Sequence, residues 1–167
     1  MMTAVSGAHT GGCQCGAVRF RVNELGRASV CCCRMCQKAT AGLGGFYVNA
    51  KNVDWTRGVP KYFVSSNVAK RGFCGDCGTP LIFETSTAVA LSIVAFDQPS
   101  DIAPAVQLAP ETRLPWGDSL ADLPRRPDPD GSYAARLAKT VSYQHPDHDT
   151  KTWEVRASGA TEWKART

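Results

Sequence analysis

Apolar and polar residues alternate along the first part of the chain with the period of β-strands. Between residues 17 and 23, three apolar residues alternate with Arg19 and Arg21, which predicts a half-buried strand with both arginines on its outer face. Further apolar runs predict strands at residues 46–48, 62–64, 81–83 and 88–96. The last two runs are expected to pair in the core. Because turn-forming residues separate the runs, the first 96 residues are expected to form mostly short strands.

The pattern changes after this strand-rich part. Seven of the ten prolines lie between Pro99 and Pro129, which favours an extended segment that wraps over a surface rather than regular structure. The apolar triplet Leu-Pro-Trp at 114–116 is predicted to anchor this wrap to the core. Short helices are predicted at 35–41 and 133–139, and a strand at 152–156.

Length and composition indicate one globular domain with an appended segment. The chain has 167 residues, of which 43% are hydrophobic and 20% charged, as is ordinary for a soluble domain. No apolar run approaches the roughly 20 residues that cross a bilayer, and residues 1–12 lack the regions of a secretory signal. We expect a cytoplasmic protein with no membrane partner. Residues 1–124 are expected to form the domain, and residues 125–167 an extension that packs on it or beside it.

Eight cysteines are the most unusual feature of the composition. They occur as the pair Cys13-Gln14-Cys15, a central cluster at 31–36, and the pair Cys74-Gly75-Asp76-Cys77. Because cytoplasmic thiols stay reduced, such clusters favour metal binding or thiol chemistry. The alternative is a disulfide framework.

The two outer pairs are predicted to form one closed zinc site. The spacing of Cys74 and Cys77 lets both sulfurs reach one ion, and Gly78 supplies the positive φ that such turns often need. Cys13 and Cys15 would complete four thiolate ligands, so the metal would hold the first strand against the middle of the chain. Four ligands leave no free coordination position, which indicates a structural role. The alternative is a redox dithiol, although no βαβ context surrounds either pair.

The central cluster is predicted to form a second, open zinc site. Residues two apart in an extended chain face the same side, so Cys31 and Cys33 point together and Cys32 points away. Cys36 can join them from the following turn. Three protein ligands with one exchangeable position are typical of catalytic zinc, which activates a thiol or polarises a carbonyl. The alternatives are a structural zinc completed by Cys32 or by a ligand not evident in the sequence, and a metal-free trio of reactive thiols.

Net charge gives no reason to expect a polyanionic partner. The formal charge is +4, and seven thiolate charges with two zinc dications would lower it by three. The near-neutral remainder argues against nucleic acid, for which phosphate neutralisation dominates affinity.

Three motifs that follow one another in order identify a resemblance. They are Gly-Gly-Cys-Gln-Cys-Gly-Ala-Val-Arg-Phe at 11–20, Cys-x-Cys-Arg-Met-Cys-Gln-Lys at 31–38, and Arg-x-Phe-Cys-Gly-Asp-Cys-Gly-Thr-Pro-Leu at 71–81. Together they resemble the glutathione-dependent formaldehyde-activating enzyme family, which includes the centromere protein V group. The resemblance covers residues 10 to 124. It implies a mainly β fold, a zinc-stapled β-tent of short antiparallel strands, with the Pro-rich wrap and the C-terminal extension added.

The resemblance also implies metal ligands and a reaction. The implied ligands are Cys13, Cys15, Cys74 and Cys77 for a structural zinc and Cys31, Cys33 and Cys36 for a catalytic zinc. This gives two zinc ions per chain, with partial occupancy of the second left open. The implied reaction joins glutathione and formaldehyde into S-(hydroxymethyl)glutathione, a carbon–sulfur lyase reaction run backwards. Position 32 is commonly His in the family and is Cys here, which bears on rate or substrate more than on metal binding.

Other polar residues have both a functional and an ordinary interpretation. Arg34, Lys38 and Arg71 are candidates to bind the carboxylates of a glutathione-like substrate, with charge balance beside the thiolates as the alternative. The run His-Pro-Asp-His-Asp at 145–149 contains metal-ligating residue types. Pro146 disfavours the helix that would align its two imidazoles, so a surface loop is expected.

Two further functions compete with an enzyme of thiol–aldehyde chemistry. One is a non-catalytic carrier that binds glutathione through the open zinc. The other is a structural zinc module that binds a macromolecule. Self-association is left open by the sequence.

Overall fold

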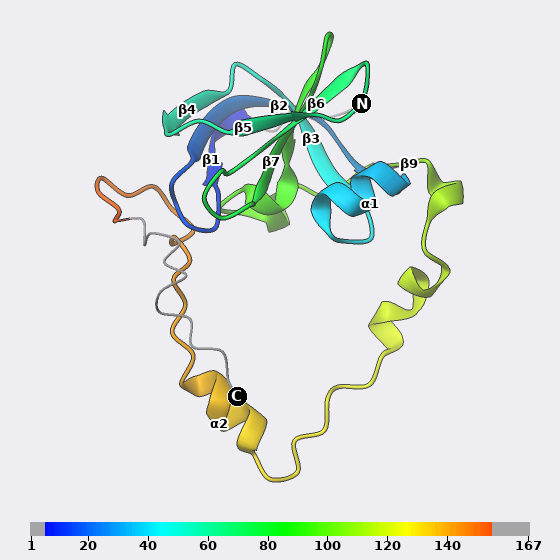
Figure 1. Cartoon of the computed structure of the whole chain (residues 1–167), viewed down its shortest axis with the longest axis vertical. Helices are drawn as coiled ribbons and strands as arrows, with labels where there is room; N and C mark the ends of the chain where they lie inside the picture. Colours follow the sequence, from blue (N-terminus) through cyan, green and yellow to red (C-terminus); the bar gives the residue numbers. More distant parts are fainter. Residues whose placement is uncertain (1–5, 155–167) are drawn as a thin grey trace.

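The computed structural model describes residues 6–154 and consists mainly of β-strands (Figure 1). The strands are β1 (Ser6–Gly12), β2 (Arg19–Cys31), β3 (Gly45–Lys51), β4 (Asp54–Arg57), β5 (Lys61–Val64), β6 (Ala69–Phe73), β7 (Pro80–Thr85), β8 (Val89–Ser92) and β9 (Val106–Leu108). The helices are α1 (Arg34–Thr40), α2 (Ser132–Ala138) and the 3-10 helices η1 (Ile93–Ala95), η2 (Pro99–Asp101), η3 (Pro110–Thr112) and η4 (Pro115–Asp122). The predicted mainly β class is confirmed. None of the helices in this described part is long and apolar enough to span a membrane.

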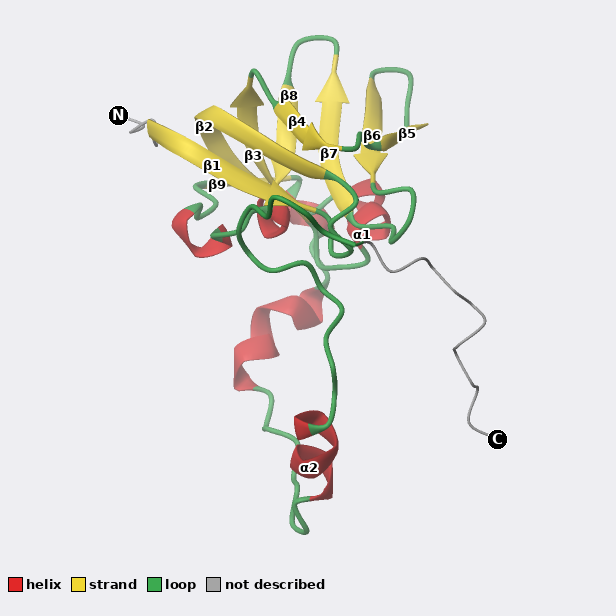
Figure 2. Ribbon diagram, turned by 90° about the vertical axis from the view of Figure 1, so that its left-hand side faces the viewer, coloured by secondary structure: helices red, strands yellow, loops and turns green. Residues whose placement is uncertain are grey.

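The nine strands of residues 6–154 form one sheet in which β2 is the central element. The order is β1-β2-β3-β8-β7-β6-β5, and β4 and β9 also pair with β2. Strand β2 pairs with four other strands: its first half pairs with β1 and β4, and its second half pairs with β3 and β9. A register shift between Leu25 and Ala28 separates the two halves. Only the short β2–β9 pairing among these is parallel. Figure 2 shows the sheet at one end of the molecule and α2 projecting away from it.

Strand β2 shows where the sequence pattern predicts burial and where it does not. Its apolar residues from Phe20 to Ala28 are buried, and the ring of Phe20 lies edge-on against Phe96 with centroids 5.0 Å apart. Arg19 was expected on the outer face, but its side chain is only 4% exposed and pairs with Asp97. That prediction is wrong because Asp97 and Asp149 both converge on Arg19 and cover it.

Most predicted elements are confirmed with shifted bounds. The helices expected at 35–41 and 133–139 are α1 and α2, and the run at 88–96 divides into β8 and η1. Strands β7 and β8 pair as predicted. Strands β1, β4 and β6 were missed because their sequences show no apolar alternation. Strand β9 was missed because its alternation spans only three residues within the proline-rich segment. Of the strand expected at 152–156, residues 152–154 are not a strand, and the remainder lies outside the described residues.

The proline-rich segment begins on the sheet and then projects from it. After β9 pairs with the end of β2, residues 113–143 run away from the sheet and return to it (Figure 1). Nearly all side chains of this segment are exposed. Trp116 is 57% exposed, so it does not anchor the segment to the core as predicted. The segment instead approaches the domain at Gly117, where an added Cβ would lie 3.3 Å from Leu43.

Candidate metal centres

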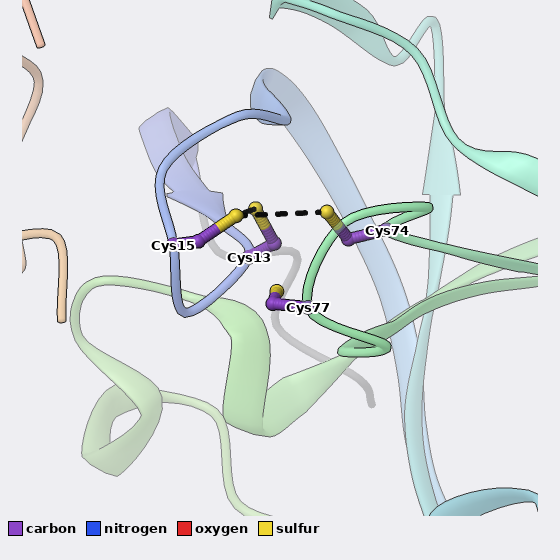
Figure 3. Close-up of side chains that lie close together, drawn as sticks. All are labelled: Cys13, Cys15, Cys74 and Cys77. Atoms are coloured by element: carbon purple, nitrogen blue, oxygen red, sulfur yellow. Dashed lines mark hydrogen bonds between the residues drawn. The ribbon is translucent and has the colours of Figure 1, made fainter. Parts of the chain in front are cut away.

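Two tight turns bring the outer cysteine pairs together. Cys13 and Cys15 lie in the turn between β1 and β2, and Cys74 and Cys77 lie in the turn between β6 and β7 (Figure 3). The sulfur of Cys15 is 3.5 Å from that of Cys13 and 3.8 Å from that of Cys74, and all four sulfurs lie within 4.8 Å of one another. A tetrahedral zinc with bonds of about 2.3 Å would place its sulfurs about 3.8 Å apart. The four sulfurs therefore fit one zinc ion.

The two turns share a backbone design that explains their glycines. The glycine that follows each pair, Gly16 or Gly78, donates its N–H to the carbonyl of the first cysteine at 3.0 Å. Both glycines have φ of +77°, a left-handed conformation that other residues rarely adopt. The turns are also joined directly, because the N–H of Gln14 donates to Thr79 Oγ1 at 3.1 Å. This bond fixes the position of one cysteine pair relative to the other.

Electrostatics in this cluster favour a bound cation. Burial raises the pKa of the Cys13 thiol to about 11 and raises that of Cys15 further. At Cys77, burial is outweighed by hydrogen bonds that include those from Thr79, so the pKa falls to about 6. Four adjacent thiols cannot all ionise without a cation, because their negative charges repel. A dication would remove this conflict by binding all four as thiolates.

The C-terminal segment closes over the Cys13–Cys15 turn. We call residues 144–153 the clasp. The amide of His145 donates to the carbonyl of Gln14 at 2.8 Å, and the indole Nε1 of Trp153 donates to the carbonyl of Cys15 at 2.8 Å. An added Cβ on Gly16 would lie 2.5 Å from the His145 ring. His145 is only 3% exposed, so the prediction of a surface loop is wrong at this residue.

A strand-to-helix junction gathers the central cysteines. Cys31 ends β2, Cys33 is the N-cap of α1, and Cys36 lies in the first turn of that helix. Their three sulfurs lie within 4.8 Å of one another. Cys31 and Cys33 are partly exposed and Cys36 is buried. Among the described residues, this trio and the four-cysteine cluster are the groups that could hold a metal ion. All eight cysteines are free.

Cys32 lies outside the trio and is tied into the protein through its backbone. Its side chain is buried, and its carbonyl accepts hydrogen bonds from Gln37 Nε2 at 2.7 Å and Thr112 Oγ1 at 2.9 Å. Gln37 Nε2 also donates to the carbonyl of Thr112 at 3.0 Å. Residues 31–37 are thereby fixed to η3, which sets the backbone that presents the three sulfurs. Arg34, on the exposed side of α1, bonds Gln37 Oε1 at 3.2 Å.

Arg71 and Tyr47 lie against the trio. Arg71 is buried in β6, where its Nη2 donates to Cys36 Sγ at 3.4 Å and its Nη1 donates to Tyr47 Oη at 3.1 Å. Burial raises the pKa of the Cys36 thiol to about 12, against the lowering effect of Arg71. Burial also acts on Cys33, but hydrogen bonds from the backbone of Cys36 and from the Cys36 and Cys31 side chains outweigh it and lower its pKa. Arg71 thus supplies positive charge to a buried sulfur.

A groove runs beside this cluster between α1 and strands β5 and β6. It consists of two adjoining cavities of about 300 Å³ and 320 Å³ that share Ala39, Phe63 and Arg71 in their walls. Tyr47 lines the first cavity, and Lys38 lines the second. We call it the Arg71 groove. Its size is in the range of small-molecule sites, which are mostly apolar with a few placed polar groups.

The family of the chain follows from a match that contains both clusters. The family model described as glutathione-dependent formaldehyde-activating enzyme matches residues 8–112, more than half of the chain. The chain belongs to this family. Membership in the formaldehyde-activating family connects the chain with glutathione and formaldehyde chemistry. The match includes every cysteine, Tyr47 and Arg71, and it ends before the clasp.

Other comparisons add little. A crystal structure of a Rhodobacter sphaeroides protein is similar with a TM-score of 0.48 and 21% sequence identity, over 59% of this chain and 98% of that one. No curated protein matches the chain. Function is therefore inferred from the family match and from the geometry of the two clusters.

The sequence pattern did not indicate that several residues would contact the cysteine clusters. Tyr47 looked like an ordinary strand residue, and its partner Arg71 is 24 positions away. Gln37 resembled any polar residue of a short helix. Trp153 reaches Cys15 across 138 positions. Local spacing finds ligands within one turn, but it does not find partners brought together by the sheet.

Proposed function

We propose that the chain is a zinc-dependent enzyme of carbon–sulfur lyase type that condenses glutathione with formaldehyde, or a related thiol with a related small aldehyde. The observation that carries this proposal is the trio of Cys31, Cys33 and Cys36, three convergent sulfurs beside a groove in a formaldehyde-activating family member. A trio leaves one coordination position free, whereas the four-cysteine cluster does not.

The two clusters receive different roles in this proposal. The four-cysteine cluster, which lies between two turns of which the clasp covers the first, would hold a structural zinc. The trio would hold the catalytic zinc, giving two zinc ions per chain. Zinc bound by the trio would supply a site that lowers the pKa of a substrate thiol and polarises the aldehyde. Arg71, which donates to Cys36, would balance the negative charge of the thiolate ligands.

The substrate would lie in the Arg71 groove. Lys38 lines the groove and Arg34 is exposed on the same helix, so both are proposed to attract the carboxylates of a glutathione-like thiol. Both terminal nitrogens of Arg71 already donate within the protein, so this residue is proposed to act at the trio instead. Eight free thiols suit a reducing compartment such as the cytoplasm, where we place the reaction.

Metal counting combined with a rate measurement tests this proposal. Zinc per chain is measured in the purified protein, and adduct formation from formaldehyde and glutathione is followed against an uncatalysed control. The wild-type chain is expected to hold two zinc ions and to accelerate the reaction. The Cys33→Ser/Cys36→Ser variant is expected to remain folded, retain one zinc ion and lose the acceleration, because the trio loses two of its three ligands.

Cys32→Ser is the matched control, since Cys32 adjoins the trio without joining it. This variant is expected to keep two zinc ions. Loss of one zinc from Cys32→Ser would favour a structural site completed by Cys32. Glutathione binding without acceleration in the wild type would favour a carrier. Absence of both would leave a structural zinc module.

A further inference from the structure

Tyr47 lines the Arg71 groove and is connected to the trio through Arg71. It lies on β3, its ring packs against Phe83 with centroids 5.8 Å apart, and it is grouped with Cys36 in a small buried cluster. The side chain is only 7% exposed, yet it forms part of the wall of the first cavity. The Tyr47 side chain is thus held in place in the wall of a ligand-sized space, and its hydroxyl is fixed by Arg71.

The hydrogen bond with Arg71 fixes what the Tyr47 hydroxyl is able to do. A guanidinium has donors and no acceptor, so Arg71 Nη1 must donate and Tyr47 Oη must accept. The single hydrogen of the phenol then remains available as a donor. Within residues 6–154, no hydrogen bond is found in which Tyr47 Oη donates. The protein therefore provides a buried hydroxyl donor whose own oxygen is already held in position.

The surroundings of Tyr47 select the kind of atom that would accept this hydrogen. Arg71 joins the hydroxyl to Cys36, because its Nη1 donates to Tyr47 Oη and its Nη2 donates to Cys36 Sγ. A small aldehyde that reacts with a thiol at the trio carries its oxygen one bond away from the reacting carbon. A positioned donor is most effective when it faces the atom on which negative charge develops.

We infer that Tyr47 is a catalytic residue that donates a hydrogen bond to the aldehyde oxygen, an inference that rests on the proposed function. Arg71 is the positioning residue that orients the Tyr47 hydroxyl. In the reaction the thiol sulfur attacks the carbonyl carbon, the carbon–sulfur bond forms and the π bond of the carbonyl breaks. The proton that the thiol releases ends on the former carbonyl oxygen, which becomes the hydroxyl of the adduct. Tyr47 stabilises the charge on that oxygen before the proton arrives.

The test compares wild-type protein with Tyr47→Phe, which removes the hydroxyl and retains the ring. Tyr62→Phe is the matched control, because Tyr62 lies on β5 with its ring under Lys70. Three quantities are measured for each protein: kcat, zinc per chain, and the Kd of glutathione with and without saturating formaldehyde. Tyr47→Phe is expected to lower kcat about 100-fold, as for the loss of one oxyanion donor. It is also expected to weaken binding about tenfold only when formaldehyde is present.

The outcomes distinguish a catalytic role of Tyr47 from a structural one. A merely structural role for Tyr47 would change the zinc content or the Kd of glutathione alone, and it would overturn the inference. Equal kcat and equal Kd values in wild type and Tyr47→Phe would also overturn it. If wild type binds the adduct without accelerating its formation, the proposed function fails, while the formaldehyde-dependent loss of affinity still supports the contact. If wild type binds neither glutathione nor the adduct, both proposals fail.

Discussion

Arg19 and Arg21 differ in environment although they are two residues apart on β2. Arg19 bonds Asp97 through both terminal nitrogens, at 2.7 Å and 2.6 Å, and reaches Asp149 at 2.8 Å. Arg21 bonds Asp149 at 3.0 Å, and its side chain is 50% exposed. Charge pairs in water contribute little, whereas removing one partner of a buried pair leaves a charge without compensation.

Substitution of these two arginines should therefore have very different effects on stability. Arg19→Met is expected to lower the free energy of unfolding by about 3–5 kcal/mol, since Asp97 would remain buried and unpaired. Arg21→Met is expected to lower it by about 1 kcal/mol or less. Urea denaturation of the zinc-loaded proteins measures both. Similar losses in the two variants would contradict the importance of the buried pair.

At the scale of elements, the two cysteine turns share a left-handed glycine after the second cysteine and differ in what covers that glycine. Gly16 and Gly78 share φ of +77°. An added Cβ on Gly78 would meet nothing within 4 Å, whereas on Gly16 it would lie 2.5 Å from His145 and 2.7 Å from Trp153. The first turn is the surface on which the clasp closes.

Substituting alanine at each of these two glycines distinguishes the effect of backbone strain from the effect of displacing the clasp. Either substitution is expected to cost about 1–2 kcal/mol of stability, the usual cost of a left-handed conformation. Gly16→Ala should in addition displace the clasp, because two rings occupy the position of the new Cβ. Hydrogen exchange of the amides in 144–153 should accelerate in Gly16→Ala and stay unchanged in Gly78→Ala. Equal exchange in both variants would argue against close packing of the clasp.

At the scale of the whole molecule, the chain leaves the sheet after β9 and returns as the clasp (Figure 1). Division into a domain at 1–124 and an extension at 125–167 remains our proposal, with the clasp joining the two. His145 is central to the contact. Its Nδ1 lies 2.7 Å from the carbonyl of Pro146 and its Nε2 lies 3.3 Å from Arg57 Nη1. Because arginine only donates, Nε2 must accept, which requires the neutral imidazole.

Closure of the clasp should therefore weaken as the pH falls. Burial and the charges of Arg19 and Arg57 lower the pKa of the His145 imidazole. A pKa lowered by folding means that the unfolded or unclasped chain binds the proton more readily. The contribution of His145 is thus complete above its ordinary pKa of about 6.5 and is lost progressively below it.

Hydrogen exchange of the His145 amide, which donates to Gln14, measures this effect. Exchange corrected for intrinsic rates should accelerate in wild type between pH 7.5 and pH 5.5, with zinc content monitored throughout. His145→Asn should remove the pH dependence, and His148→Asn, at an exposed neighbouring histidine, should retain it. Identical pH profiles in wild type and His145→Asn would assign the change to another group.

The sequence by itself determined the strand-rich class, both short helices and the grouping of the cysteines. These features are local: alternation repeats within one strand, and sulfurs separated by one or two residues share a turn whatever surrounds it. The meeting of the two outer pairs was also predictable, because four ligands complete one tetrahedral site.

Only the tertiary structure decided which polar residues surround those cysteines. Arg71 reaches Tyr47 across 24 positions, Arg19 reaches Asp97 across 78, and Trp153 reaches Cys15 across 138. Burial of Arg19 and His145 likewise came from distant segments that cover them, against the local pattern. The physical reason is that a side chain's charge environment depends on every segment packed against it, whereas sequence spacing describes one segment at a time.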